Sequence, residues 1–67
     1  MRADQVKVSW DGDKRKWLVR IEVGAEVIRR HCDQSRDVDE AKLRAAAQAT
    51  VVDEGYQVDD SRISIVR

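Results

Sequence analysis

The chain has 67 residues, of which 42% are hydrophobic, and its 13 Lys and Arg side chains balance 13 Asp and Glu side chains. This length gives room for a single small domain, residues 1–67, with one thin core. Zero net charge argues against a protein that condenses DNA through overall positive charge, because such binding rests on neutralising phosphates, but it allows one basic face.

The N-terminal part predicts a strand and a hairpin turn. Residues 1–4 are polar and are expected to be frayed. From Gln5 to Trp10 apolar and polar residues alternate, which predicts a strand with Val6, Val8 and Trp10 facing the core. Asp11-Gly12 signals a hairpin, and a loop of four or six residues would also keep these three side chains on the core side.

The stretch from Lys16 to Cys32 predicts two more strands, joined at Gly24-Ala25. Glycine at the first position of a two-residue loop is typical of a type II′ turn, which sets Val23 opposite Glu26. Side chains on a strand alternate between the two faces of the sheet. One face then collects the apolar side chains and is expected to face the core: Trp17, Val19, Ile21, Val23, Ile28 and Cys32.

The same register places two arginines, Arg20 and Arg29, directly opposite each other on the other face. It also puts Arg30 on the core side, where its stem must pack and its charged end must reach the rim. A three-residue loop would instead turn Arg29 and His31 toward the core, which would bury more charge. We therefore expect the two-residue loop.

A helix is expected from Val38 to Glu54. Asp37 is typical of an N-cap residue, and Glu40 three positions later would complete a capping box. Gly55 would end the helix in the left-handed conformation that follows a C-cap.

Two apolar stripes run along this helix. The expected core stripe is rich in Ala, which allows close approach to the sheet, and comprises Val38, Ala41, Ala45, Ala49 and Val52. The second stripe is expected to be partly exposed and comprises Leu43, Ala46, Ala47, Thr50 and Val51. High helix propensity explains its Ala content. Alternatively, the second stripe is a surface for a partner protein or a second copy of the chain, formed by Leu43, Ala47, Thr50 and Val51.

A last strand is expected from Arg62 to Val66, with Ile63 and Ile65 on one side. The expected fold is α+β with the order β-β-β-α-β. It has a three-stranded antiparallel meander, one helix packed on one sheet face, and a C-terminal strand. A right-handed crossover allows the last strand to lie parallel to the first and beside it, which gives the strand order third, second, first, fourth.

The sequence offers little catalytic chemistry. His31 and Cys32 are the only residues of their kinds, and as strand neighbours they point to opposite faces, so they cannot act as a nucleophile–base pair or share a metal. No zinc-ligand spacing and no nucleotide-binding motif occurs. We expect no enzyme, no cofactor and no metal. No signal peptide or membrane span is visible and no internal disulfide is possible, so we expect a cytoplasmic protein without a membrane partner.

The outer face of the expected sheet carries much of the basic charge. Residues 1–36 hold nine Lys and Arg against six Asp and Glu. The candidate nucleic-acid-binding residues are Lys7, Arg20, Arg29 and His31 on the face, with Lys14, Arg15 and Lys16 in the first turn. Opposed arginines are unfavourable unless an anion bridges them or Glu22 screens them. The face is therefore either a solvated surface with Glu22 as counter-charge, or a surface that binds nucleic acid or an acidic protein.

The run KWLVRIEVGAEVIRR, followed by DVDEAKLRAAA, resembles the small N-terminal arm-type DNA-binding domain of tyrosine recombinases. That family packs a three-stranded sheet on one helix, and its exposed sheet face enters the major groove of DNA. The resemblance implies DNA contacts by Arg20 and Arg29. The E-A-x3-A-x3-A pattern of the helix also resembles small HicB-like antitoxin domains.

These observations lead to two hypotheses. The first is a stand-alone, non-enzymatic binding module whose basic sheet face contacts nucleic acid. The second is a protein-interaction or homodimeric regulatory domain that uses the stripe from Leu43 to Val51.

Overall fold

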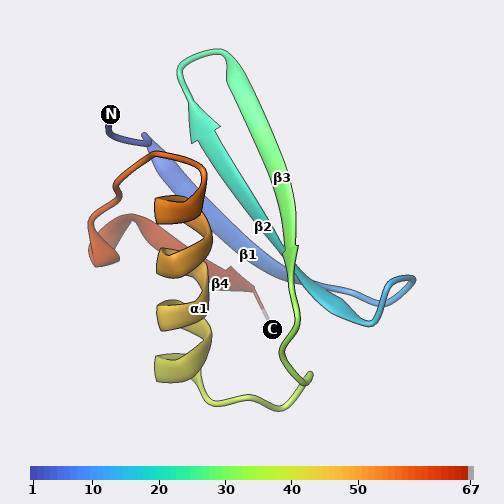
Figure 1. The fold of residues 1–67 in the computed structure, drawn as a ribbon. Coiled ribbons are helices and arrows are strands. Elements are labelled where there is room, and N and C mark those ends of the chain that lie inside the picture. Colours follow the sequence, from blue (N-terminus) through green and yellow to red (C-terminus); the bar gives the residue numbers. More distant parts are fainter. Residues whose placement is uncertain (67) are drawn as a thin grey trace.

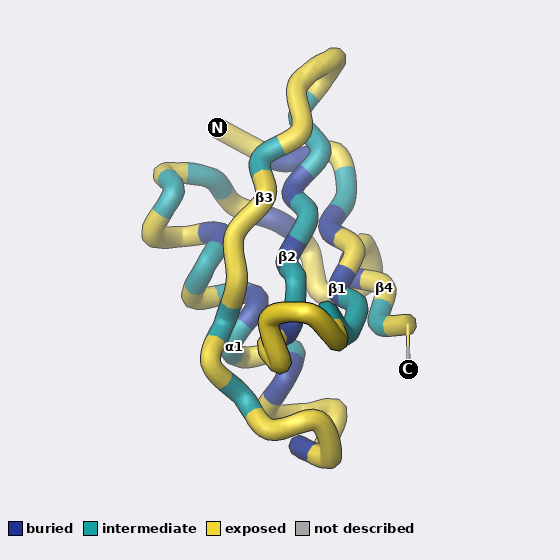
Figure 2. Tube along the Cα trace, turned by 90° about the vertical axis from the view of Figure 1, so that its right-hand side faces the viewer, coloured by how far each residue is buried: buried dark blue, intermediate teal, exposed yellow. Residues whose placement is uncertain are grey.

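The structure is a computed structural model that describes residues 1–66, and it consists of one four-stranded sheet with one helix on one face (Figure 1). The elements in chain order are β1 (Gln5–Asp11), β2 (Lys16–Val23), β3 (Glu26–Cys32), α1 (Glu40–Asp53), the short 3-10 helix η1 (Asp60–Arg62) and β4 (Ile63–Val66). Figure 2 shows the strands side by side in the order β3-β2-β1-β4. β4 runs parallel to β1, and the other two pairs are antiparallel. The expected β-β-β-α-β fold and the place of the last strand are confirmed.

The turn between β2 and β3 has the expected two residues. Gly24 has a φ of 57°, and Ala25 does not share this left-handed conformation, which is the pattern of a type II′ turn. Val23 pairs with Glu26 as expected. The Asp4 carboxylate accepts a hydrogen bond from the backbone N–H of Gly24 at 2.6 Å, so the N-terminal segment also holds this turn.

The loop between β1 and β2 has four residues, because Asp11 pairs with Lys16. The Asp11 carboxylate accepts hydrogen bonds from the backbone N–H groups of Asp13 and Lys14 at 3.1 and 3.4 Å. Arg15 then closes the loop with a φ of 55°, a conformation that no other non-glycine residue adopts within residues 1–66. An even loop length keeps Val6 and Val8 on the core side, and both side chains are wholly buried.

The core lies between the sheet and α1. Its fully buried larger side chains are Val6, Val8, Trp17, Val19, Ile21, Leu43 and Val51. Trp17 is the largest of them, and its indole N–H donates to the Ser35 carbonyl at 2.9 Å, which satisfies the one polar atom it brings inside. Trp10 packs edge-to-face against Trp17 with ring centroids 5.4 Å apart, and the guanidinium of Arg36 lies 5.9 Å from the Trp10 ring centre.

The orientation of α1 is the reverse of the expected one. Leu43, Ala47 and Val51 have no exposed surface, whereas the side chain of Val52 is 61% exposed. Burying Leu and Val removes more apolar area from water than burying Ala, at about 25 cal/mol per Å², so the bulkier stripe faces the sheet. Val38 is also buried, but from the loop before α1, so it does not extend the Ala-rich stripe.

The proposed partner surface of Leu43, Ala47, Thr50 and Val51 is therefore wrong. Leu43, Ala47 and Val51 belong to the core. Thr50 is half-buried, and its hydroxyl donates to the Ala46 carbonyl of its own helix at 2.9 Å. None of the four offers a free apolar surface to another protein.

The helix begins two residues later than expected. Asp39, not Asp37, is the N-cap, because its carboxylate accepts from the backbone N–H of Lys42 at 2.9 Å. The C-terminal end agrees with the expectation. Gly55 has a φ of 87°, and the backbone N–H of Tyr56 reaches back to the Val51 carbonyl at 3.1 Å, as in a Schellman motif.

The first residues are ordered by pairing, contrary to the expectation of fraying. The backbone N–H of Ala3 donates to the Gln57 carbonyl at 2.8 Å, and the N–H of Gln57 donates to the Met1 carbonyl at 2.9 Å. Ala3 is buried as a result. Arg2 adds an ion pair with Asp59 at 3.0 Å on the exposed side of this contact.

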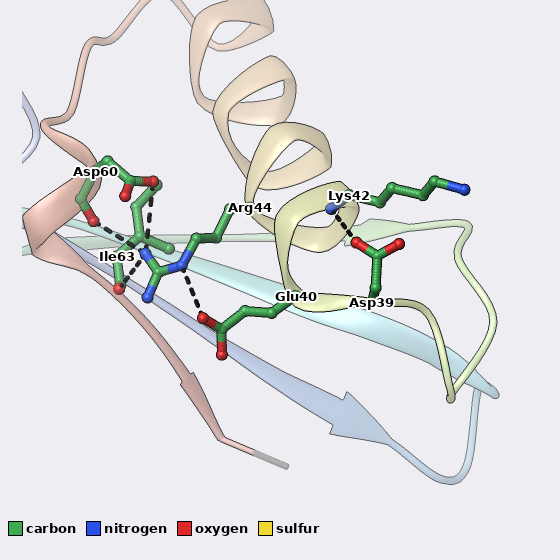
Figure 3. Close-up of polar contacts among 6 residues, drawn as sticks. All are labelled: Asp39, Glu40, Lys42, Arg44, Asp60 and Ile63. Atoms are coloured by element: carbon green, nitrogen blue, oxygen red, sulfur yellow. Dashed lines mark hydrogen bonds and ion pairs between the residues drawn. The ribbon is translucent and has the colours of Figure 1, made fainter.

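Arg44 ties α1 to the segment that leads into β4 (Figure 3). Its Nη1 donates to the backbone carbonyls of Asp60 and Ile63, both at 3.0 Å. Its Nε lies 3.4 Å from the carboxylate of Glu40, one turn earlier in the helix. One side chain therefore links the first half of α1, η1 and the start of β4.

Candidate nucleic-acid interface

The sheet face opposite α1 carries three basic side chains in one line across three strands. Lys7 on β1 lies opposite Arg20 on β2, and Arg20 lies opposite Arg29 on β3. We call these three residues the cationic row. The sequence placed Lys7 on this face but left its partner on β2 open, because the length of the β1–β2 loop was open. The four-residue loop sets Lys7 directly opposite Arg20.

Arg20 and Arg29 form a closely spaced cross-strand pair. A two-residue turn makes Val23 and Glu26 a hydrogen-bonded pair, and such pairs alternate with non-hydrogen-bonded ones along an antiparallel ladder. Three steps from the turn, Arg20 and Arg29 form a non-hydrogen-bonded pair, in which side chains lie closer together. Consistent with this, the Arg29 carbonyl points away from β2 and accepts from Nη1 of Arg30 at 2.8 Å.

The row has little counter-charge. The carboxylate of Glu22 lies 3.8 Å from Nζ of Lys7 and 3.3 Å from the side-chain amide of Gln5, so it leans toward β1. Within residues 1–66, the guanidinium groups of Arg20 and Arg29 take part in no ion pair or hydrogen bond. Nε of Arg20 is closed off from solvent and has no hydrogen-bond partner. Glu22 thus pairs with Lys7 and forms no ion pair with either arginine.

Arg29→Gln should raise the free energy of unfolding by a few tenths up to about 1 kcal/mol, because like charges directly opposite in a sheet repel. Urea denaturation measures the change. Arg30→Gln is the matched control on the neighbouring position, and it should lower stability slightly, since Arg30 pairs with Glu54 at 2.9 Å. A loss of stability in Arg29→Gln would contradict the absence of a partner for Arg29.

His31 lies on the same face but is already paired. Its Nε2 is 3.0 Å from Oδ2 of Asp11, which reaches over from the end of β1. The hydrogen bond with His31 lowers the pKa of Asp11 below its ordinary value of 3.8, and the N–H groups of Asp13 and Lys14 add to the effect. His31 therefore closes the first loop against β3 instead of presenting a free cation.

His31→Gln should raise the pKa of Asp11 toward 3.8, which carbon-detected NMR of the carboxyl group measures. Because folding lowers this pKa, the carboxylate stabilises the protein above pH 3.8, and that stabilisation is lost as the pH falls through the folded-state pKa. Val27→Ala, on the same strand and face, should leave the pKa of Asp11 where it is. An unchanged value in His31→Gln would assign the lowering to the loop N–H groups alone.

The other basic candidates lie at one end of this face. Lys14 and Arg15 are exposed in the β1–β2 loop, and Lys16 is exposed at the start of β2. The structure thus joins Lys7, Arg20 and Arg29 into one row and leaves these three residues as a separate basic loop.

Other chemistry is sparse. Within residues 1–66 no three His, Cys, Asp or Glu side chains are placed to hold a metal ion, and α1 is neither long nor apolar enough to cross a membrane. Burial raises the pKa of the Cys32 thiol, which packs half-buried against the core. Trp10, Trp17 and Tyr56 all pack on the core side, so none of them lies on the outer face.

No family model, curated protein or solved structure matches this chain.

Proposed function

We propose that the chain is a small, non-enzymatic module that binds the phosphate backbone of nucleic acid through the outer face of its sheet. The observation that carries the proposal is the opposition of Arg20 and Arg29 without a carboxylate between them. Such a pair is unfavourable in the free protein and becomes favourable when an anion lies against it. Guanidinium groups suit phosphate because their planar donors match its oxygens.

Several features favour a polymer of phosphates as the ligand. The cationic row spans three strands, and the exposed Lys14, Arg15 and Lys16 add charge at one end of the face. The outer face has no Trp, Tyr or Phe side chain on which a base could stack, so contacts to a duplex backbone are favoured over single-strand binding. The resemblance to the arm-type domains of tyrosine recombinases supports duplex DNA in particular.

The alternative, a protein-interaction or homodimeric domain, rested on the stripe from Leu43 to Val51. Leu43, Ala47 and Val51 of that stripe lie in the core, so the stripe is not available as a binding surface for another protein. An acidic protein on the cationic row remains the competing ligand. The proposal includes a cytoplasmic location, which suits a chain with one cysteine and no disulfide.

Mixed-sequence duplex DNA should bind with an affinity that falls roughly forty-fold between about 50 and 200 mM salt, if the cationic row and the basic loop together neutralise three phosphates. Fluorescence anisotropy of a labelled duplex measures both affinities. Arg29→Gln should weaken binding and reduce the slope of log affinity against log salt by about one. Arg30→Gln removes the same charge from the opposite face and should leave the slope unchanged.

The absence of DNA binding at the lower salt would refute the proposal and leave an acidic protein as the ligand class. Equal loss of affinity in Arg29→Gln and Arg30→Gln would also count against it. That result would mean that overall charge, and not the cationic row, attracts the DNA.

A further inference from the structure

We infer that Arg20 and Arg29 hold one phosphate group jointly, as a discrete oxyanion site, and do not each contact a separate phosphate. The inference rests on the proposed function, since it specifies how the cationic row meets the backbone. It also predicts something that the proposed function does not, namely binding of a single free phosphate ion.

The pairing geometry supports a shared ligand. Arg20 and Arg29 sit directly opposite in a non-hydrogen-bonded pair, where side chains approach most closely. Glu22, the acidic residue on the same face of β2, is turned toward Lys7 and Gln5. Neither guanidinium group forms an ion pair within residues 1–66, and one phosphate with several acceptor oxygens can accept from both.

The burial of the Arg20 side chain restricts which of its nitrogen atoms can donate to a phosphate. Nε is covered and unpartnered, so the side chain is held by packing and not by hydrogen bonds. The terminal nitrogens are not closed off in this way, and they are the donors left for a ligand. Arg29 is exposed on the edge strand β3 and can complete the site from the other side.

Lys7 is not expected to belong to this site. It lies on the opposite side of Arg20, on β1, and it has a carboxylate within 3.8 Å. An anion placed between Arg20 and Lys7 would be repelled by Glu22, whereas neither Arg20 nor Arg29 forms an ion pair with a carboxylate within residues 1–66. The site is thus specific to one side of Arg20.

The experiment titrates inorganic phosphate against the protein at constant ionic strength set with chloride. NMR of the arginine Nε–Hε groups follows Arg20 and Arg29, because phosphate also stabilises proteins nonspecifically and a rise in Tm alone would not identify a site. Saturable shifts of both side chains are expected. Arg20→Gln and Arg29→Gln should each weaken phosphate binding by about tenfold or more, the usual weight of a hydrogen bond to a charged group.

The single variants separate a shared ligand from two independent ones. With one shared phosphate, Arg29→Gln should weaken the phosphate-dependent shift of Arg20, and Arg20→Gln should weaken that of Arg29, because the two side chains hold the same ion. Arg30→Gln should bind phosphate as the unmodified protein does. A shift of Arg20 that is unchanged in Arg29→Gln, or shifts confined to one arginine in the unmodified protein, would overturn the inference.

The outcomes also separate this inference from the proposed function. DNA binding with the expected salt dependence but no saturable phosphate shift refutes the shared site and leaves the proposed function intact. Phosphate binding without DNA binding supports the site and refutes nucleic acid as its ligand. The absence of both refutes both.

Discussion

Leu43→Ala should lower the free energy of unfolding by about 3 kcal/mol, within the range measured for buried leucines truncated to alanine. Leu43 has no exposed surface and packs in the core between α1 and the sheet, so the truncation leaves a cavity and removes apolar contacts. Small domains have roughly 5–15 kcal/mol of stability in total, and a 67-residue chain lies toward the low end. Chemical denaturation followed by circular dichroism measures the loss.

Val52→Ala is the matched control for Leu43→Ala. Val52 lies on the same helix but is 61% exposed, so its truncation should change stability by no more than about 0.5 kcal/mol. The Ala-rich orientation of the helix would give the reverse result, with Val52 as the sensitive position. The pair of variants therefore tests which stripe of α1 faces the sheet.

Arg44→Met should destabilise the protein by about 2–3 kcal/mol, in the upper range for hydrogen bonds that involve a charged group. The substitution keeps an unbranched apolar stem but removes the donors to the Asp60 and Ile63 carbonyls. It also removes the contact with Glu40 at 3.4 Å (Figure 3). Amide hydrogen exchange should rise most in η1 and β4, because these segments lose their link to α1.

Lys42→Met is the control for Arg44→Met, since it makes the same change in charge and shape two residues earlier. The backbone N–H of Lys42 bonds to Asp39 and remains after the substitution. Its side chain is exposed, so stability should be nearly unchanged. Equal effects of the two variants would mean that the helix needs positive charge in general and not the contacts of Arg44.

The sheet could be predicted from the sequence because its signals are local. Alternation from Gln5 to Trp10 and glycine at position 24 determine which side chains share a face, and a one-residue slip would move every apolar side chain to solvent. The opposition of Arg20 and Arg29 follows from the same register. The sequence therefore contained the centre of the candidate site.

The helix orientation could not be predicted in the same way. Apolar residues occur on two sides of α1, and counting positions does not distinguish a stripe of alanines from one that holds Leu43 and Val51. The buried area of these two larger side chains decides between them. Val38 was also assigned wrongly to a helical stripe. It is buried, but it lies in the loop before α1 and therefore does not follow the helical period.

Two contacts that shape the site have no local signal. Asp11 reaches His31 across twenty positions, which turns a candidate cation into a paired side chain. Glu22 leans toward Lys7, and only the three-dimensional arrangement shows that this leaves Arg20 and Arg29 without a carboxylate. The direction of a side chain within one sheet face depends on neighbours from several strands. The sequence alone does not show which of these neighbours the side chain contacts.

The position of β1 between β2 and β4 has a consequence for how the chain folds. β1 meets β2 through a four-residue loop, but it meets β4 only after nearly the whole chain has been closed, since Val6 pairs with Ile63. Closing a long loop costs more entropy than closing a short one, and contacts distant in sequence slow folding. The meander of β1, β2 and β3 is therefore expected to form early. Docking of η1 and β4 would then complete the sheet as the final step, and Arg44 would bind these segments through its hydrogen bonds to the Asp60 and Ile63 carbonyls.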